Sequence, residues 1–190
     1  VFSSFYLFYK KMSKIQLYIA ASIDGFIARE DGGLDWLELP NPSKVDYGYA
    51  QFLSGIDTVV TGRKTYQEVL GFGVEWPYKG CKTYVVTSSA DLELPTPDTF
   101  SMPLPDAEAV RKLRGQSQKN IWLLGGGQLV THFLNLGELD EIILCMIPVI
   151  LGKGIRLFPG EPRETGFDLK HTQAFDTGAV LLTWQKKLDG

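Results

Sequence analysis

Three consecutive glycines separate an apolar run from a segment with helical periodicity. The run at residues 121–124 predicts a short buried strand, and the apolar residues at 129, 130, 133 and 134 share one face of a predicted helix. Glycine lets a ligand approach the backbone because it has no Cβ, and a helix N-terminus offers free N–H groups with a partial positive charge. A phosphate site and a tight turn without a ligand are the two interpretations of this junction, which comprises Gly125, Gly126, Gly127, Gln128 and Leu129.

A second junction of the same kind carries two cations. A β-branched run at residues 57–61 predicts a strand, and a helix is predicted to extend from the junction to about residue 70. Thr65 and Glu68 have the spacing of a capping box, which places the free amides of this helix around residues 63–66. The residues of the junction are Gly62, Arg63, Lys64 and Thr65.

A third predicted strand, residues 82–87, ends in Ser88 and Ser89. The ligand crevice of an open α/β sheet lies at the carboxyl ends of its strands. Hydroxyl groups, free amides and two cations therefore converge on one edge of the predicted sheet, and two glycine junctions suit a diphosphate. The sequence has no GxGxxG opening, no P-loop and no GxSxG elbow of a serine hydrolase.

The remaining segments complete an α/β pattern. A helix is predicted at residues 43–54, capped by Ser43 and with Asp46 at its third position, as in a capping box. The proline-rich stretch at residues 92–105 predicts a connecting loop with one short strand at most. The other predicted elements are strands at residues 14–21 and 140–150 and a helix at residues 106–114.

The C-terminal end of the sequence breaks the alternation of strands and helices. Two predicted strands at residues 167–175 and 179–187 flank a turn at residues 176–178, which predicts a β-hairpin. The whole pattern predicts a mixed, mainly parallel sheet with antiparallel strands at one end and helices on both faces.

Composition fits one globular domain of 190 residues, with 44% hydrophobic residues and a net charge of -3. This charge favours neither nucleic acid nor a membrane surface as a partner. Cys81 and Cys145 lie in apolar runs and form no CxxC pair, which predicts reduced thiols and a cytoplasmic location. His132 and His171 have no metal-ligand spacing, so no metal site is expected.

Residues 1–11 differ in character from the rest of the chain. They are aromatic and apolar and end in Lys10 and Lys11, the reverse of the order in a signal peptide. We expect an N-terminal extension here and a single domain over residues 12–190, with Met12 as its natural start.

Four motifs together resemble the dihydrofolate reductase fold family, and most closely its riboflavin-biosynthesis pyrimidine reductase branch. Their order and spacing match from Lys14 to Lys187, and they are more specific for the fold than for the substrate. The resemblance implies a dihydrofolate-reductase-like three-layer α/β fold. The motifs are ASIDGFIA at 21–28, TGRKTY at 61–66, GGGQL at 125–129 and PVILGKG at 148–154.

The resemblance implies a nicotinamide cofactor, usually NADPH. Its phosphates would meet Arg63, Lys64 and Thr65, its adenosine would lie beside Ser88 and Ser89, its diphosphate would lie at residues 126–129, and its nicotinamide would lie beside Ala20 and Ile27. A cis peptide is implied between the first two glycines of the triplet. Gln128 stands where a dihydrofolate reductase commonly has Arg, which removes a cation and weakens the expected preference for NADPH over NADH.

The resemblance also implies substrate-binding residues. Asp46, sixteen residues before Gly62, matches the carboxylate that binds the substrate's amino group and supports its protonation; a helix-capping aspartate is the alternative. Asp24 and Trp36 are further implied contacts, and Trp36 either covers the site from its loop or packs in the core. Arg156 could meet a substrate phosphate.

These implications define the expected function. It is an NADPH-dependent reductase that transfers hydride to a pyrimidine or pterin-like substrate, of the riboflavin-biosynthesis 5-amino-6-(5-phosphoribosylamino)uracil reductase type. Dihydrofolate reduction and nucleotide binding without turnover are the alternatives. The branch usually forms homodimers, and the apolar run at residues 142–150 is a candidate interface strand.

Overall fold

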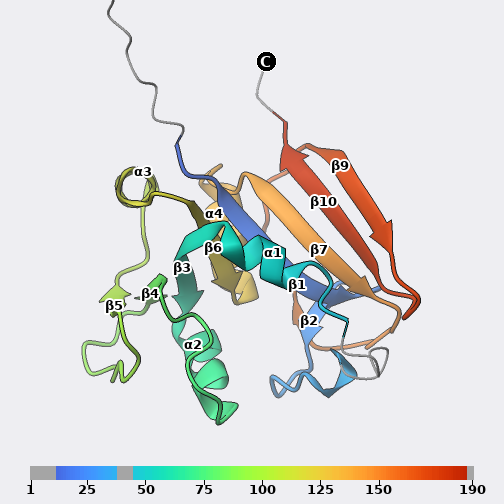
Figure 1. Ribbon diagram of the computed structural model, residues 1–190, viewed down its shortest axis with the longest axis horizontal. Helices are drawn as coiled ribbons and strands as arrows, with labels where there is room; N and C mark the ends of the chain where they lie inside the picture. The colour runs from blue at the N-terminus through green and yellow to red at the C-terminus, as the bar shows by residue number, and fades with distance from the viewer. Residues whose placement is uncertain (1–11, 38–44, 188–190) are drawn as a thin grey trace, which may run out of the picture.

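The computed structural model describes residues 12–37 and 45–187. Eight strands form one sheet in the order β5-β4-β3-β6-β1-β7-β10-β9, so that the first strand of the chain lies in the middle (Figure 1). The bounds of these strands are β1 Ile15–Ser22, β3 Ile56–Gly62, β4 Lys82–Val86, β5 Thr99–Met102, β6 Asn120–Gly125, β7 Glu141–Ile147, β9 Phe167–Ala174 and β10 Val180–Lys186.

The sheet is mixed and mainly parallel, as predicted. The six strands from β5 to β7 pair in parallel, and β10 pairs antiparallel with both β7 and β9. The predicted C-terminal hairpin is therefore confirmed. Alternation along β1 places Ile15 and Leu17, both fully buried, on one face and Tyr18 on the other. Because the six parallel strands share a direction, their carboxyl ends meet at one edge of the sheet.

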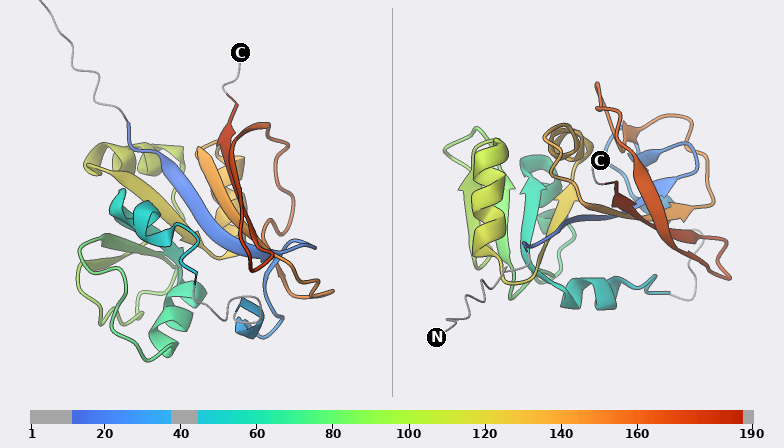
Figure 2. Two further views of the ribbon diagram at one scale, coloured as in Figure 1. Left: turned by 45° about the vertical axis from the view of Figure 1, so that its right-hand side comes forward. Right: turned by 90° about the horizontal axis from the view of Figure 1, so that it is seen from above.

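Helices cover both faces, which confirms the three-layer architecture. Helices α3 (Ala107–Gln116) and α4 (Gly127–Asn135) pack against the face that carries Ile15 and Leu17. Helices α1 (Tyr49–Ser54) and α2 (Arg63–Gly71) pack around Trp122 and its neighbours on the opposite face. Figure 2 shows α1 and α4 on opposite sides of the sheet. Within the described residues, no helix is both long and apolar enough to span a membrane.

Both helices that follow the predicted capping boxes begin elsewhere. Helix α1 begins at Tyr49 because Tyr47 (φ 55°) and Gly48 (φ 84°) adopt left-handed conformations that an α-helix excludes. The prediction of a helix from residue 43 is therefore wrong for residues 45–48, which are not helical. Ser43 itself lies outside the described residues. Helix α2 begins with Gly62 at its N-cap and without a side-chain cap, so the capping box of Thr65 is also wrong.

The candidate interface strand at residues 142–150 corresponds largely to β7 (Glu141–Ile147), and its role in an interface stays a prediction. Strand β7 is paired on one side by β1 and on the other by β10, so it has no open edge to offer another chain. It ends at Ile147, directly before Pro148, which has no backbone N–H to continue the ladder.

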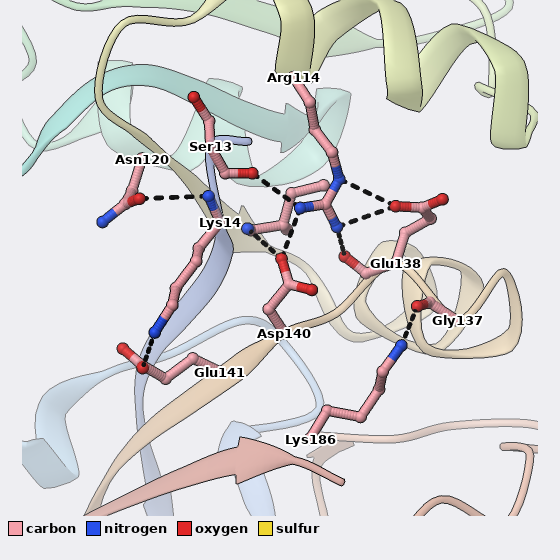
Figure 3. A network of polar contacts seen from close by, with 10 residues as sticks. Ser13, Lys14, Arg114, Asn120, Gly137, Glu138, Asp140, Glu141 and Lys186 are labelled. Atoms are coloured by element: carbon pink, nitrogen blue, oxygen red, sulfur yellow. Dashed lines mark hydrogen bonds and ion pairs between the residues drawn. The ribbon is translucent and has the colours of Figure 1, made fainter. Parts of the chain in front are cut away.

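A buried arginine ties the end of α3 to the starts of β1 and β7 (Figure 3). Arg114 is 6% exposed and forms ion pairs with Glu138 at 2.8 Å and Asp140 at 2.6 Å. It also donates to the carbonyl of Ser13 at 2.7 Å, while Asp140 accepts from the amide of Ile15 at 2.7 Å. This network lies at the edge of the sheet opposite the carboxyl ends of the parallel strands.

Candidate functional site

The two glycine junctions lie side by side at the carboxyl edge of the sheet. Strands β3 and β6 are neighbours, and the hydroxyl of Thr61 donates to the carbonyl of Gly125 at 3.2 Å. A Cβ added at Gly126 would lie 3.2 Å from the hydroxyl of Thr65. The start of α2 therefore adjoins the start of α4. The peptide between Gly125 and Gly126 is cis, as the resemblance implied.

A cavity of about 450 Å³ opens beside the start of α2. It joins the first residue of α2, the end of β4 and the segment after β5, and so brings Arg63 and Ser88 together as predicted. Ser89 is not among the residues that line the cavity, and its amide donates to the hydroxyl of Thr87 at 3.0 Å. The lining residues are Arg63, Val86, Thr87, Ser88, Pro103 and Leu104.

Sequence reasoning missed the wall that Pro103 and Leu104 provide. Leu104 is apolar and 60% exposed, and it follows the four-residue strand β5 within the stretch predicted as a connecting loop with one short strand at most. An exposed leucine between prolines was the available signal, but its meaning depends on β5 pairing with β4.

Two cations lie at the start of α2. Arg63 and Lys64 are exposed, and within the described part of the chain no carboxylate forms an ion pair with either. In α4 the amides of Leu129 and Val130 donate to the carbonyl of Gly126 at 2.9 and 3.1 Å, which leaves the amides before them without an intrahelical partner. Such amides and cations favour a phosphate.

Further along the helix start, the two residues that complete the motif differ in burial. Gln128 is exposed, whereas the side chain of Leu129 is buried in the core. Leu129 can therefore contact a ligand at the start of α4 only through its backbone.

A small two-stranded sheet packs over the start of α4. It pairs β2 (Phe26–Ala28) with β8 (Ile155–Arg156) in antiparallel fashion. The guanidinium of Arg156 lies 5.1 Å from the centroid of the Phe26 ring, and Ile27 is partly buried against the main core. The approach to α4 is close, because a Cβ at Gly127 would lie 2.4 Å from the carbonyl oxygen of Arg156.

Trp36 packs in the core, which agrees with the second of its two interpretations. It is fully buried against Cys145 and its neighbours in a cluster that also includes Ala20. Ala20 pairs with Cys145 across β1 and β7. The indole N–H of Trp36 is buried and has no hydrogen-bond partner within the described residues. Burial raises the pKa of Cys145 to about 11, so this thiol is neutral at physiological pH.

Asp46 lies three residues before the first residue of α1 and is exposed. Both of its oxygens lie 3.2 Å from the amide of Ala50, which is a capping contact. The hydroxyl of Tyr18 on β1 donates to the carbonyl of Tyr47, the residue after Asp46, at 3.1 Å, and burial raises the pKa of Tyr18. Asp46 thus stands near β1 on the face that carries Tyr18, and its catalytic role stays a prediction.

Asp24 is engaged by the chain itself. Its carboxylate accepts hydrogen bonds from the hydroxyl of Ser22 and from the amides of Leu151 and Gly152. The Ser22 hydroxyl is the main cause of a lowered pKa at Asp24, and the two amides add to it. The implied contact with substrate stays a prediction. Within the described ranges, no group of three His, Cys, Asp or Glu side chains could hold a metal ion.

Comparison with known proteins places this geometry in a family. Residues 81–181 match the RibD C-terminal domain. The uncharacterized protein YwjB of Bacillus subtilis (strain 168) is 41% identical over 168 residues, which cover 88% of this chain and 95% of that protein.

Solved structures agree on the fold. A Shewanella sp. PV-4 protein named for riboflavin biosynthesis is 28% identical, with a TM-score of 0.82 over 92% of this chain and 99% of its own. A Thermotoga maritima diaminohydroxyphosphoribosylaminopyrimidine deaminase/5-amino-6-(5-phosphoribosylamino)uracil reductase is 18% identical, with a TM-score of 0.69. The match covers 94% of this chain and 58% of that enzyme. At that identity the second likeness concerns the fold alone. On the family match and the Bacillus relative, the chain belongs to the RibD C-terminal domain family.

Proposed function

We propose that this protein is an NADPH-dependent reductase that transfers hydride to a pyrimidine or pterin-like substrate. Membership of the RibD C-terminal domain family supports an oxidoreductase of the riboflavin pathway. The name of the Thermotoga maritima enzyme, whose fold this chain shares, points to a 5-amino-6-(5-phosphoribosylamino)uracil reductase type of reaction.

Two observations carry the proposal: the cavity beside the start of α2, and the start of α4 that adjoins the start of α2. Arg63 lines the cavity, and neither Arg63 nor Lys64 has a counter-ion within the described residues. Arg63, Lys64 and Thr65 would hold the cofactor's phosphates, Gly126 and the start of α4 its diphosphate, and Ser88 with Ser89 its adenosine. Positive charge, free amides and missing Cβ atoms all fit a dinucleotide at this edge.

The reaction needs a hydride donor, a proton source and a bound substrate. NADPH would supply the hydride when bound. Ala20 and Ile27 would flank its nicotinamide, and the neighbouring cluster around Trp36 supplies a dry wall. Asp46 would hold the proton-delivering position near β1.

Cofactor titrations with two charge-removing variants test the proposal. Arg63→Ala should weaken NADPH by about 1–3 kcal/mol if the guanidinium meets the extra phosphate, and should weaken NADH less. Arg111→Ala removes an exposed arginine from α3 and should change neither affinity. Equal losses for NADPH and NADH would restrict Arg63 to the diphosphate, and no loss for either would refute its role.

Turnover separates the reductase from its alternatives. Steady NADPH oxidation, followed by absorbance with a panel of aminopyrimidines and pterins, should be fastest with a ribosylated aminopyrimidine. Preference for dihydrofolate would instead assign a dihydrofolate reductase. NADPH binding without turnover on any member of the panel would assign a nucleotide-binding protein.

We also propose a homodimer. Both edges of β7 are paired within the sheet, so the candidate strand at residues 142–150 would contribute a face, and not an edge, to the contact. Light scattering during size-exclusion chromatography should give twice the chain mass of 21.2 kDa, and a mass of one chain would refute it.

A further inference from the structure

The carboxylate of Asp24 joins two loops that are far apart in the sequence. One oxygen accepts from the hydroxyl of Ser22 at 2.6 Å and from the amide of Leu151 at 3.1 Å. The other oxygen accepts from the amide of Gly152 at 2.7 Å. The turn that follows β1 is therefore bound to the loop that follows β7 through one side chain.

The loop after β7 continues into a segment, residues 151–157, that we call the strap. Gly154 (φ 152°) crosses Ala28 so closely that an added Cβ would lie 2.2 Å from its carbonyl oxygen. The amide of Leu157 donates to the carbonyl of Gly25 at 3.0 Å. Both contacts hold the strap against β2 and the turn that precedes it.

The other side of the strap rests on α4. An added Cβ at Gly127 would lie 2.4 Å from the carbonyl oxygen of Arg156 and 3.2 Å from that of Leu157. Just beyond the strap, the hydroxyl of Thr131 on α4 donates to the carbonyl of Pro159 at 3.0 Å. The position of the strap therefore determines where the start of α4 lies relative to β1 and β2.

We propose that Asp24 is a positioning residue, whose carboxylate holds the strap and, through it, the start of α4. This role replaces a direct substrate contact, because the hydrogen bonds of both oxygens come from the chain itself. The benefit to ligand binding rests on the proposed function, in which the start of α4 receives the cofactor's diphosphate. The mechanical link from Asp24 to the strap and α4 does not depend on which ligand binds.

Hydrogen exchange measured by mass spectrometry tests the link in the full chain. Asp24→Ala removes both acceptors, and we expect at least tenfold faster exchange at residues 151–157 and faster exchange at the first amides of α4. Asp24→Asn keeps one acceptor and should give a smaller increase. Asp31→Asn is the matched control and should leave the strap unchanged, since among the described residues Asp31 accepts only from the amide of Gly33, within its own turn, at 2.9 Å.

Titration with NADPH tests the consequence, with an expected rise in Kd of three- to tenfold for Asp24→Ala and no change for Asp31→Asn. Unchanged exchange of the strap in Asp24→Ala would overturn the proposal, and so would a loss confined to substrate KM. Faster strap exchange with unchanged α4 exchange and unchanged NADPH affinity would overturn the link to α4. If the wild-type chain binds no NADPH, the proposed function fails, and exchange at α4 alone decides the role of Asp24.

Discussion

The first turn of α4 has no room for a side chain at Gly127. An alanine there would place its Cβ 2.4 Å from the carbonyl oxygen of Arg156 and 2.9 Å from Cδ of Pro159, whereas ordinary contacts begin near 3.4 Å. The carbonyl must therefore retreat by about 1 Å, the difference between 3.4 and 2.4 Å. Overpacking of this kind costs about 1–3 kcal/mol.

A matched glycine isolates this steric cost. Gly71 ends α2, and an added Cβ there meets nothing within 4 Å. Alanine in a helix gains up to about 1 kcal/mol over glycine, so Gly71→Ala should be neutral or stabilising. The difference in unfolding free energy between Gly127→Ala and Gly71→Ala should then be about 1–3 kcal/mol.

Urea unfolding followed by circular dichroism measures this difference. Gly127→Ala should also weaken NADPH, because the displaced helix start would no longer face the diphosphate. Equal unfolding midpoints for the two variants would refute the reasoning, since they would show that the strap yields without cost.

Three further predictions concern other parts of the molecule. Asp46→Asn should leave the unfolding free energy nearly unchanged, because Asn caps helices about as well as Asp, while turnover falls; unchanged turnover with intact NADPH binding would make the residue structural. Arg114→Ala should lower the free energy of urea unfolding by about 3 kcal/mol, because Glu138 and Asp140 lose their counter-ion, whereas Arg111→Ala, at an exposed position, should lower it hardly at all. The thiol of Cys145, whose pKa burial raises to about 11, should react with a disulfide reagent at pH 8 only after unfolding. Since the unfolded thiol ionises first, stability should fall from about pH 9 to 11, and Cys145→Ala should reduce this slope.

Periodicity and glycine spacing predict the parts of this fold that local sequence encodes. The strand at residues 57–61, the glycine triplet and the C-terminal hairpin all appear in the structure because apolar alternation and turn residues act over short distances. The start of α3 also follows local chemistry, since Asp106 accepts from the amide of Ala109 at 2.8 Å.

The parts that could not be predicted depend on strand order or on tertiary constraint. The left-handed conformation of Tyr47 shortens α1 although its sequence permits a helix. Strands β2 and β8 have three and two residues, too few to show a period. The wall of the cavity at Leu104 exists because β5 pairs with β4. The carboxylate of Asp24 accepts its hydrogen bond from Gly152 in a loop more than a hundred residues away.

The central place of β1 has a consequence for how the chain folds during synthesis. This strand is made first, yet its two neighbours, β6 and β7, end at residues 125 and 147. At a synthesis rate of about 5–20 residues per second, roughly 5–25 s pass between the synthesis of β1 and the completion of its two neighbours. Pairings of such long sequence separation close slowly, whereas the β9–β10 hairpin is local. A chain that stops before β7 would present β1 with an unpaired edge, and we expect such fragments to aggregate rather than to fold.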